Sequence, residues 1–344
     1  MSTANLNEIA QQLVAPKKGI LAADESTGTI ARRLSSVNVE STEETRRQWR
    51  QLLLTAADMG KYISGVILYD ETIRQKASDG TPFPQVLARQ GVIPGIKVDK
   101  GAKPLAGSTG ETVTEGLDGL RERFQDYREL GAQFAKWRAV IKIGPGIPTA
   151  YCIDTNAQAM ARYAALTQEA GLVPIVEPEV LMDGDHDIDR CFEVTETTLH
   201  RMFTELIAQR VSLEGMLLKP NMVLSGKDAA NRAGPEVVAE KTVTCFRRAV
   251  PAAVPGIVFL SGGQSDEEAT VNLNAINRNR GNAPWQLSFS YGRGLQASPL
   301  KVWSGDAKKV PAAQQAFLHR AKVTSAAREG VYTPELEKEA AAAQ

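Results

Sequence analysis

The sequence predicts an α/β protein built as a single-domain (β/α)8 TIM barrel with a short C-terminal tail. Short apolar, β-rich runs recur along the 344 residues and alternate with helical patterns. The spacing between runs leaves room for a helix and two loops, as a crossover between parallel strands requires. Polar residues follow several runs, among them Asp24 after the first, Glu177 and Glu179 after the fifth and Lys219 after the sixth. Strand ends and the loops after them form the active-site face of such a barrel. A doubly wound open sheet is the alternative, but no Gly-x-Gly-x-x-Gly follows the first run.

Eight runs are predicted as the barrel strands. Each is rich in aliphatic and β-branched residues, as buried parallel strands usually are. We assign residues 1–330 to one barrel domain, a usual size for this architecture. Residues 331–344 are polar with few apolar anchors, so we expect a mobile tail. The runs begin near Ile20, Ile63, Val92, Arg138, Val173, Gly215, Gly256 and Trp285.

Helix-start signals lie between the predicted strands. Three are capping-box patterns, in which the side chains of the first and fourth residues each accept a hydrogen bond from the other residue's backbone N–H. The fourth signal is a proline suited to the first helical turn. These signals support the alternation of strands and helices. They stand at Ser41-x-x-Glu44, Thr155-x-x-Gln158, Ser265-x-x-Glu268 and Pro235.

Composition excludes several classes of partner. The 40 basic and 40 acidic residues balance, so no bulk electric field favours nucleic acid or a membrane surface. No window approaches the run of about 18 apolar residues that a membrane span needs, and the first residues lack a signal-peptide pattern. Cys152, Cys191 and Cys245 are scattered, which fits reduced thiols in a cytoplasmic protein.

The histidines argue against a metal site. The sequence contains only His186, His200 and His319, which are not clustered. Metal-dependent carbonyl chemistry usually needs two or three imidazoles close together. The acidic stretch 183–187 surrounds one histidine but lacks ordered ligand spacing. We therefore expect neither a metal nor another cofactor.

Lys219 is the most informative residue, because it ends the apolar run Met216-Leu217-Leu218. Desolvation lowers the pKa of a buried lysine and favours the free amine. A free amine can attack a ketone or aldehyde and form a Schiff base. The alternative is a strand-end lysine that only extends its amine to water. Lys142 stands in a similar run, so this pattern alone does not choose between the two lysines.

Other charged residues indicate what such an amine could do. An amine beside carboxylates suits carbonyl chemistry, with Asp24 and Glu177 dividing the acid and base roles. The alternative is a set of ion pairs that closes the top of the barrel. Side chains at i and i+2 of a strand share a face. This rule pairs Glu177 with Glu179, Lys97 with Asp99, and Lys136 with Arg138.

Two glycine-containing turns suggest phosphate binding. Ser261-Gly262-Gly263-Gln264-Ser265 leads from the seventh run into a helix start, where backbone N–H groups can form an anion nest. Tyr291-Gly292-Arg293-Gly294 follows the eighth run and adds a guanidinium suited to phosphate. These loops are the usual phosphate site of this architecture, although ordinary glycine turns are the alternative. Together with the amine they predict a phosphorylated ketose as substrate.

Seven segments, in order along the chain, carry a resemblance to a known family. They are residues 19–28, 95–101, 135–138, 176–179, 217–222, 259–265 and 289–293. Over about residues 6–330 the chain resembles class I fructose-1,6-bisphosphate aldolases. The resemblance implies reversible Schiff-base cleavage of fructose 1,6-bisphosphate to dihydroxyacetone phosphate and glyceraldehyde 3-phosphate, without a metal. Glycolysis and gluconeogenesis are the implied setting.

The resemblance also assigns roles to residues. Lys219 would form the imine, Glu177 would be the main general acid/base, and Asp24 would take the proton of the C4 hydroxyl. Lys136 would assist carbinolamine formation, and Glu179 would orient and tune its neighbours. The remaining residues would bind substrate: Ser261, Gly262, Gly263, Gly292 and Arg293 the phosphate on C1; Ser26, Thr29, Lys97, Arg138, Arg33 and Arg46 the second phosphate; and Ser290 as a further contact.

Two features qualify the resemblance. Thr29 stands where the family commonly has serine, and the change keeps the hydroxyl. Many animal members end in a tyrosine that reaches the active site, whereas the last tyrosine here is Tyr332, so tail-assisted proton transfer is in doubt. Many members are homotetramers, and we expect the same here.

Two other functions remain open. A transaldolase shares Schiff-base barrel chemistry, but it would not need a second phosphate grip, and an assay with fructose 1,6-bisphosphate alone separates the two. A non-catalytic barrel kept as a scaffold is the other alternative, because a fold alone implies no activity. The sequence does not rank fructose 1,6-bisphosphate against fructose 1-phosphate or sedoheptulose 1,7-bisphosphate.

Overall fold

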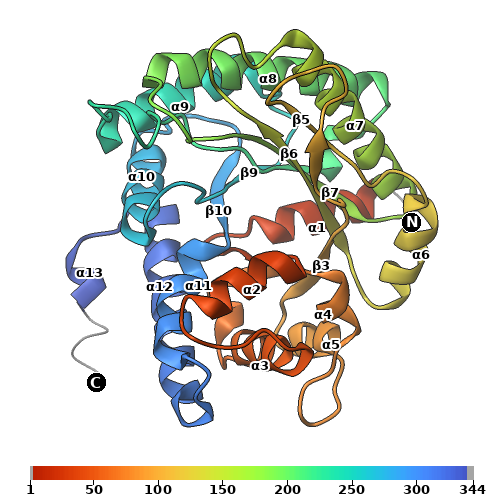
Figure 1. Cartoon of the computed structure of the whole chain (residues 1–344), viewed down its shortest axis with the longest axis vertical. Coiled ribbons are helices and arrows are strands. Elements are labelled where there is room, and N and C mark those ends of the chain that lie inside the picture. The colour runs from red at the N-terminus through yellow and green to blue at the C-terminus, as the bar shows by residue number, and fades with distance from the viewer. Residues whose placement is uncertain (1–2, 339–344) are drawn as a thin grey trace.

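The computed structural model describes residues 3–338 and contains a closed barrel of parallel strands (Figure 1). The strand order around the barrel is β1-β10-β9-β8-β7-β6-β3-β2. All the predicted strands are present, so the predicted fold class is confirmed. Their bounds are β1 Gly19–Ala23, β2 Ile63–Leu68, β3 Ile93–Lys97, β6 Phe134–Ile141, β7 Val173–Val180, β8 Leu217–Leu218, β9 Gly256–Phe259 and β10 Gln286–Tyr291.

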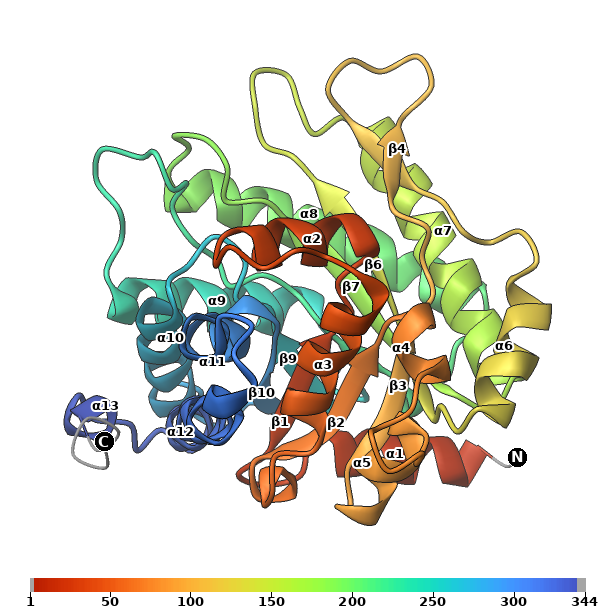
Figure 2. The same ribbon diagram turned by 60° about the horizontal axis from the view of Figure 1, so that its bottom comes forward.

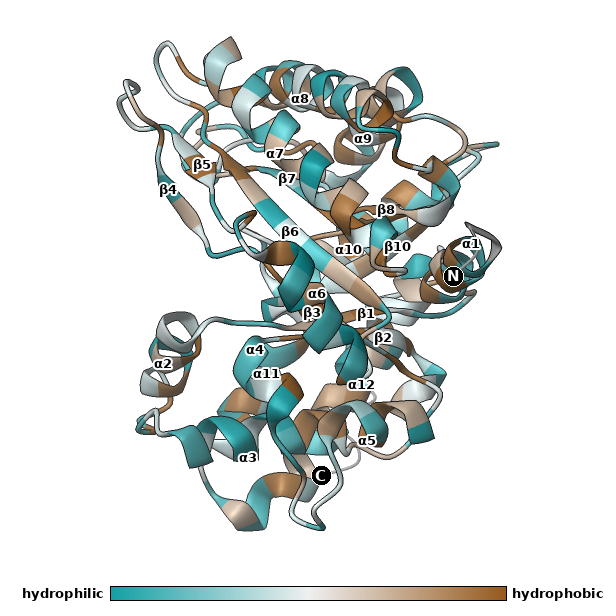
Figure 3. Cartoon of the chain, turned by 90° about the vertical axis from the view of Figure 1, so that its right-hand side faces the viewer, coloured by the Kyte–Doolittle hydropathy of each residue, from teal (hydrophilic) through white to brown (hydrophobic). Residues whose placement is uncertain are grey.

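Strands β6 and β7 extend beyond their predicted limits. β6 begins at Phe134 rather than near Arg138, and β7 continues to Val180. Glu177 and Glu179 therefore lie inside β7 instead of after its end. Hydrophilic and hydrophobic residues alternate along β6 (Figure 3), which interrupted the apolar pattern in the sequence. A barrel strand tolerates such charges because alternate side chains point to opposite faces.

Helices surround the barrel, and a small hairpin projects beside β6. The hairpin pairs β4 (Ala102–Pro104) with β5 (Thr112–Thr114) in antiparallel register. The α-helices are α1 Thr3–Leu13, α2 Thr27–Ser35, α3 Glu43–Leu54, α4 Asp70–Arg74, α5 Phe83–Arg89, α6 Leu120–Glu129, α7 Ala150–Glu169, α8 Ile188–Ala208, α9 Pro235–Ala249, α10 Asp266–Arg278, α11 Arg293–Trp303, α12 Val310–Arg328 and α13 Glu335–Lys338. Short 3-10 turns occur at Met59–Lys61, Leu213–Gly215 and Ala307–Lys309.

Two of the predicted helix starts are confirmed and two are shifted. Pro235 opens α9, and the Ser265 side chain caps α10 by accepting from the Glu268 N–H. The capping residue of α3 is Thr42, one residue after the predicted Ser41. α7 begins earlier than predicted and is capped by Thr149. Neighbouring hydroxyl residues can cap equally well, so tertiary packing selects among them.

Helix α1, which the sequence did not indicate, closes one end of the barrel. Leu6, Ile9 and Leu13 pack with inward residues such as Ile20 and Ile67. Figure 2 shows α1 on the opposite side of the strands from α2. With this end filled by apolar side chains, the open end is the one at which the strands finish. None of the described helices has the length and apolar character needed to cross a membrane.

Part of the predicted tail contacts the barrel. The Tyr332 N–H donates to Asn274 Oδ1 of α10 at 3.0 Å, and Glu337 forms an ion pair with Arg320 of α12. These partners lie far away in the sequence, so the composition of the tail did not reveal them. Residues 339–344 lie outside the described residues, and the mobility of the tail stays a prediction.

We expect deletion of residues 331–344 to leave the fold and Schiff-base formation intact, because the barrel supplies the amine and the carboxylates. Single-turnover cleavage by full-length and truncated protein should differ by less than tenfold, about 1.4 kcal/mol of barrier. A larger loss in a normally folded truncation would mean that the tail, through a group such as Tyr332, takes part in proton transfer.

Candidate active site

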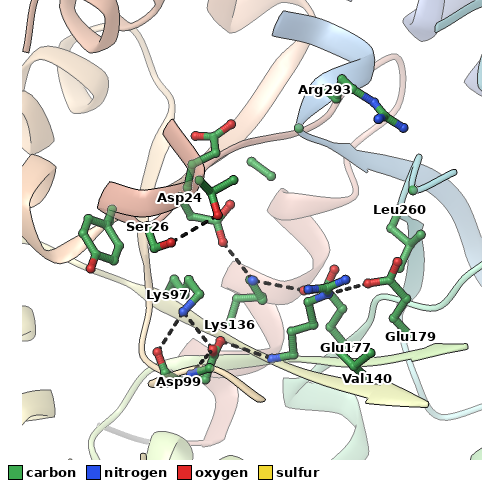
Figure 4. A pocket seen from close by; sticks show the side chains of 18 of the residues that line it. Asp24, Ser26, Lys97, Asp99, Lys136, Val140, Glu177, Glu179, Leu260 and Arg293 are labelled. Atoms are coloured by element: carbon green, nitrogen blue, oxygen red, sulfur yellow. Dashed lines mark hydrogen bonds and ion pairs between the residues drawn. The ribbon is translucent and has the colours of Figure 1, made fainter. Parts of the chain in front are cut away.

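A cavity of about 1440 Å³ lies at the carboxyl ends of the barrel strands (Figure 4). Every residue predicted for the site except Arg46 lines it. Because parallel strands all end on this face, residues far apart in the chain meet here. The predicted residues in the lining are Asp24, Ser26, Thr29, Arg33, Lys97, Lys136, Arg138, Glu177, Glu179, Lys219, Ser261, Gly262, Gly263, Ser290, Gly292 and Arg293.

The structure does not bring Arg46 into this cavity. Its Nε donates to Glu71 Oε1 at 2.8 Å and its second nitrogen to Oε2 at 2.6 Å. Both carboxylate oxygens of Glu71 are thus engaged, in the bidentate geometry that arginine prefers. Arg46 in α3 is turned toward Glu71 of α4 and away from the cavity. Residue spacing along the sequence does not reveal this pairing, because the two residues lie in separate helices. We therefore leave Arg46 out of the proposal below.

The two candidate amines differ in their surroundings. Lys219 is buried, only 3% exposed, whereas Lys142 is exposed and is not among the cavity-lining residues. The Lys219 backbone N–H donates to Val176 O at 2.8 Å, which fixes the lysine beside β7. Its Nζ lies 3.2 Å from Glu177 Oε1. Of the two lysines, only Lys219 can meet a substrate bound in this cavity.

Lys136 links the two carboxylates of the site. Its Nζ lies 2.8 Å from Asp24 Oδ2 and 3.1 Å from Glu177 Oε2 (Figure 4). Glu177 in turn contacts Lys219 through its other oxygen. The four side chains form a continuous row in which carboxylates and amines alternate, in the order Asp24, Lys136, Glu177 and Lys219. Such a row allows protons to be exchanged between neighbours within hydrogen-bond distance.

This row controls the protonation of its members. Burial raises the pKa of Asp24 and Glu177, but the positive charges of Lys136 and Lys219 outweigh it and hold both carboxyl pKa values below their usual range. Burial acts in the opposite sense on Lys136, yet Asp24 and Glu177 raise the pKa of its amine well above normal. At neutral pH both acids are therefore carboxylates and Lys136 is an ammonium.

The two predicted phosphate turns lie together. Arg293, the first residue of α11, donates to Gln264 O at 3.4 Å. A Cβ on Gly262 would lie 2.7 Å from Glu179 Oε1 and would force that carboxylate to shift, and Gly263 has a positive φ of 76°. The turn runs directly into the capped N-terminus of α10. Glycine backbone, helix N-terminus and guanidinium are thus placed together in an arrangement that suits an anion.

Cationic side chains also gather on another side of the cavity. Lys97 Nζ lies 2.7 Å from Asp99 Oδ1, and Arg138 pairs with Glu179. Ser26, the N-terminal cap of α2, donates to the Thr29 hydroxyl at 3.2 Å. Figure 4 shows Arg293 across the cavity from Lys97 and Asp99. The cavity therefore has two cationic ends with the row of acids and amines between them.

A family model described as glycolytic fructose-bisphosphate aldolase class-I matches residues 5–344. The chain belongs to the class-I fructose-bisphosphate aldolase family. The predicted family and the predicted lyase class are thus confirmed, and aldolases of this class do not depend on a metal. The assignments of individual residues stay predictions.

Several aldolases are similar to this chain over most of its length. A probable fructose-bisphosphate aldolase class 1 of Xanthomonas campestris pv. campestris is 60% identical over 94% of this chain and 96% of its own. Fructose-bisphosphate aldolase 4, cytosolic, of Arabidopsis thaliana is 57% identical over 92% and 81%. The solved fructose-bisphosphate aldolase of Plasmodium falciparum is 48% identical, covers 96% of both chains and superposes with a TM-score of 0.95.

Other residues of this aldolase line the cavity without having been predicted for the site. Arg32 and Ser36 stand three and seven residues after Thr29 in or just beyond α2, a helical spacing that could have revealed them. Arg123 comes from α6 and donates to Val98 O at 2.8 Å. Nothing local in the sequence marks Arg123. Asp99 was noted only for sharing a strand face with Lys97.

The acidic stretch that includes His186 does not assemble a metal-binding cluster. Among residues 3–338, no group of three or more His, Cys, Asp or Glu side chains could hold a metal ion. Asp183 of this stretch pairs instead with Lys227 from the loop after β8.

Proposed function

We propose that this aldolase cleaves fructose 1,6-bisphosphate reversibly to dihydroxyacetone phosphate and glyceraldehyde 3-phosphate through a Schiff base on Lys219. The observation that carries the proposal is the buried Lys219 amine, 3.2 Å from a carboxylate and flanked by two cationic ends of one cavity. Two anion grips suit a ketose with a phosphate at each end. A transaldolase substrate with one phosphate would leave the second grip unused.

In the first step the two grips orient the substrate. Arg293 and the 261–263 turn would hold the phosphate on C1, and Lys97, Arg138, Ser26 and Thr29 would hold the one on C6. Arg33 also lines this cavity. Binding at both ends places the ketone carbon C2 beside Lys219, so part of the entropic cost of reaction is met on binding.

Imine formation then uses Lys219, Glu177 and Lys136. Glu177, a carboxylate in the free site, would first take a proton from Lys219, and the resulting free amine adds to C2. The proton that the nitrogen loses on addition moves to the former carbonyl oxygen and gives a carbinolamine. Lys136 is suited to stabilise this oxygen as its charge develops, because it carries a positive charge in a buried site. Glu177 would pass a proton to the departing hydroxyl, which leaves as water and yields the iminium.

Cleavage follows because the iminium withdraws electrons from the C3–C4 bond. As this bond breaks, its electron pair forms the enamine and the C4 oxygen becomes the aldehyde. Asp24 accepts the C4 hydroxyl proton in this step. Its low pKa keeps it as the carboxylate that the step requires. Protonation of the enamine at C3 and hydrolysis of the imine release dihydroxyacetone phosphate and free Lys219.

Borohydride trapping tests this proposal. Reduction in the presence of dihydroxyacetone phosphate, followed by peptide mapping, should place the adduct on Lys219. An adduct on Lys142 or Lys136 would overturn the assignment. Absence of any adduct, together with no cleavage of fructose 1,6-bisphosphate, would favour a non-catalytic barrel.

The phosphate grip on C1 gives a second quantitative test. We expect Arg293→Ala to raise KM for fructose 1,6-bisphosphate and to lower kcat, because binding energy at the phosphate helps orient the reacting carbon. The total loss in kcat/KM should be on the order of 2–4 kcal/mol. Steady-state kinetics measure it, with inorganic phosphate as a competitive inhibitor of the native enzyme. An unchanged KM would place the C1 phosphate elsewhere.

Location and assembly are also proposals. We infer a cytoplasmic location, because an Arabidopsis relative is named cytosolic and a pea relative, 58% identical, is named a cytoplasmic isozyme. We also propose a homotetramer, as in many members of the family. Sedimentation of the purified protein tests the second inference.

A further inference from the structure

Asp99 is a buried carboxylate that the scheme above does not use. It follows β3, is 8% exposed and lines the cavity. Its Oδ1 lies 2.7 Å from Lys97 Nζ and accepts from the Gly101 N–H at 3.1 Å. Its Oδ2 accepts from the Arg138 N–H at 3.3 Å. One side chain thus joins β3, β6 and the loop that leaves β3.

Asp99 holds the Lys97 ammonium from two directions. Besides the contact with Oδ1, Lys97 Nζ donates to the Asp99 main-chain oxygen at 2.8 Å. An ammonium has three donors, so one remains for a ligand. Without these contacts the flexible lysine stem would sample several rotamers. Asp99 therefore restricts the direction in which Lys97 can offer its remaining proton.

The same carboxylate supports the position of Arg138. Strands β3 and β6 pair in register through Lys97 and Lys136, two residues before Arg138. The bond from the Arg138 N–H to Asp99 extends this pairing beyond the end of β3. The Arg138 side chain then reaches Glu179 at the cavity wall. Both cations proposed for the second phosphate thus depend on Asp99.

The C1 grip is built from different elements. Arg293 and the 261–263 turn belong to the loops after β10 and β9, whereas the contacts of Asp99 given above lie on β3, β6 and the loop after β3. A disturbance at Asp99 should therefore reach the second phosphate and spare the first. A positioning role of Asp99 can therefore be measured as a change in kcat/KM for a bisphosphate relative to a substrate with a phosphate on C1 alone.

We propose that Asp99 is a positioning residue that sets the preference of this aldolase for a ketose with two phosphates over one with a phosphate on C1 alone. The inference rests on the proposed function, in which Lys97 and Arg138 bind the second phosphate. Asp99 touches no reacting atom: its contacts are with Lys97, the Gly101 N–H and the Arg138 N–H, and its charge adds to those of Asp24 and Glu177 in raising the pKa of Lys136.

The test is Asp99→Asn in the full-length enzyme, assayed with fructose 1,6-bisphosphate and fructose 1-phosphate. The amide keeps the size of the side chain, but its NH2 group must face either Lys97 or the Arg138 N–H, both of which are donors. We expect kcat/KM for the bisphosphate to fall about tenfold or more, mainly through KM. The value for the monophosphate should stay within about twofold.

Three comparisons make the result decisive. Glu111→Gln alters another buried carboxylate, which binds Thr149 and does not line the cavity, and should leave the substrate ratio unchanged. Asp99→Glu keeps the negative charge but moves it by one methylene. It should also lower kcat/KM for the bisphosphate relative to the monophosphate, and it replaces Asp99→Asn as the test variant if Asp99→Asn fails to fold. In protein that already carries Lys97→Met, adding Asp99→Asn should lower kcat/KM for the bisphosphate by a smaller factor than Asp99→Asn does alone, because the two residues act together.

An equal fall for both substrates, or an unchanged ratio in both Asp99 variants, would overturn the inference. That outcome is distinct from failure of the proposed function, which would show in the native enzyme as no cleavage of fructose 1,6-bisphosphate or no trapping on Lys219.

Discussion

Lys219→Arg protein is expected to fold normally and to cleave no fructose 1,6-bisphosphate above background. Guanidinium stays protonated, so it cannot add to the C2 ketone even though it keeps the positive charge beside Glu177. Turnover and borohydride trapping should vanish together, while thermal unfolding should show a folded protein. Circular dichroism and a trapping assay on the same preparation measure both properties.

Lys142→Arg is the matched control for this variant. Lys142 also follows an apolar strand, β6, but it is exposed and is not among the cavity-lining residues. It should keep nearly native activity and trapping. If Lys142→Arg were inactive and Lys219→Arg active, Lys142 would be the residue that forms the imine.

Glu177→Gln is expected to cause the next largest loss, about 10²–10⁴-fold in kcat, the usual contribution of a general acid/base. The amide cannot exchange a proton, yet it has nearly the same size, and its oxygen can still accept a hydrogen bond from one of the two neighbouring lysines, Lys136 or Lys219. Single-turnover kinetics should show slow formation and slow hydrolysis of the imine. Rapid quenching with borohydride at timed intervals measures both rates.

Two controls separate this chemical effect from a loss of stability. Glu111→Gln removes a buried carboxylate away from the cavity and should leave both rates unchanged. Loss of the Glu177 charge also removes one of the carboxylates that raise the pKa of Lys136, so a trapping assay over pH should accompany the kinetics. Native imine-formation and hydrolysis rates in Glu177→Gln would assign the acid/base role to another residue.

Much of the fold could be predicted because it depends on short-range patterns. The apolar runs at β1, β2, β9 and β10, and the capping residue Ser265, carry their structure in a few adjacent residues. The predicted bounds of β6 and β7 were too short, because charged residues break the apolar pattern of both strands. In the structure these charged residues line the cavity. The closure of the barrel bottom by α1 could not be read, since its apolar partners come from many strands.

The candidate site shows the same division. The strand-end position of Lys219 and the two glycine turns were visible in the sequence, and the family resemblance separated Lys219 from Lys142. That Lys136 stands between Asp24 and Glu177 depends on three strands, β1, β6 and β7, coming together in the closed barrel. The sequence paired Lys136 only with Arg138, because i, i+2 spacing relates residues of one strand and not of three.

The sequence by itself therefore determined the barrel, the family and the residue types available for imine chemistry, because hydrophobic periodicity and turn residues act locally. Only the tertiary structure decided which charges meet. It removed Arg46 from the cavity by pairing it with Glu71, and it placed Asp99 between Lys97 and the Arg138 backbone. The physical reason is that electrostatic and hydrogen-bond energies depend on distances between atoms, and barrel closure sets those distances for residues from separate strands.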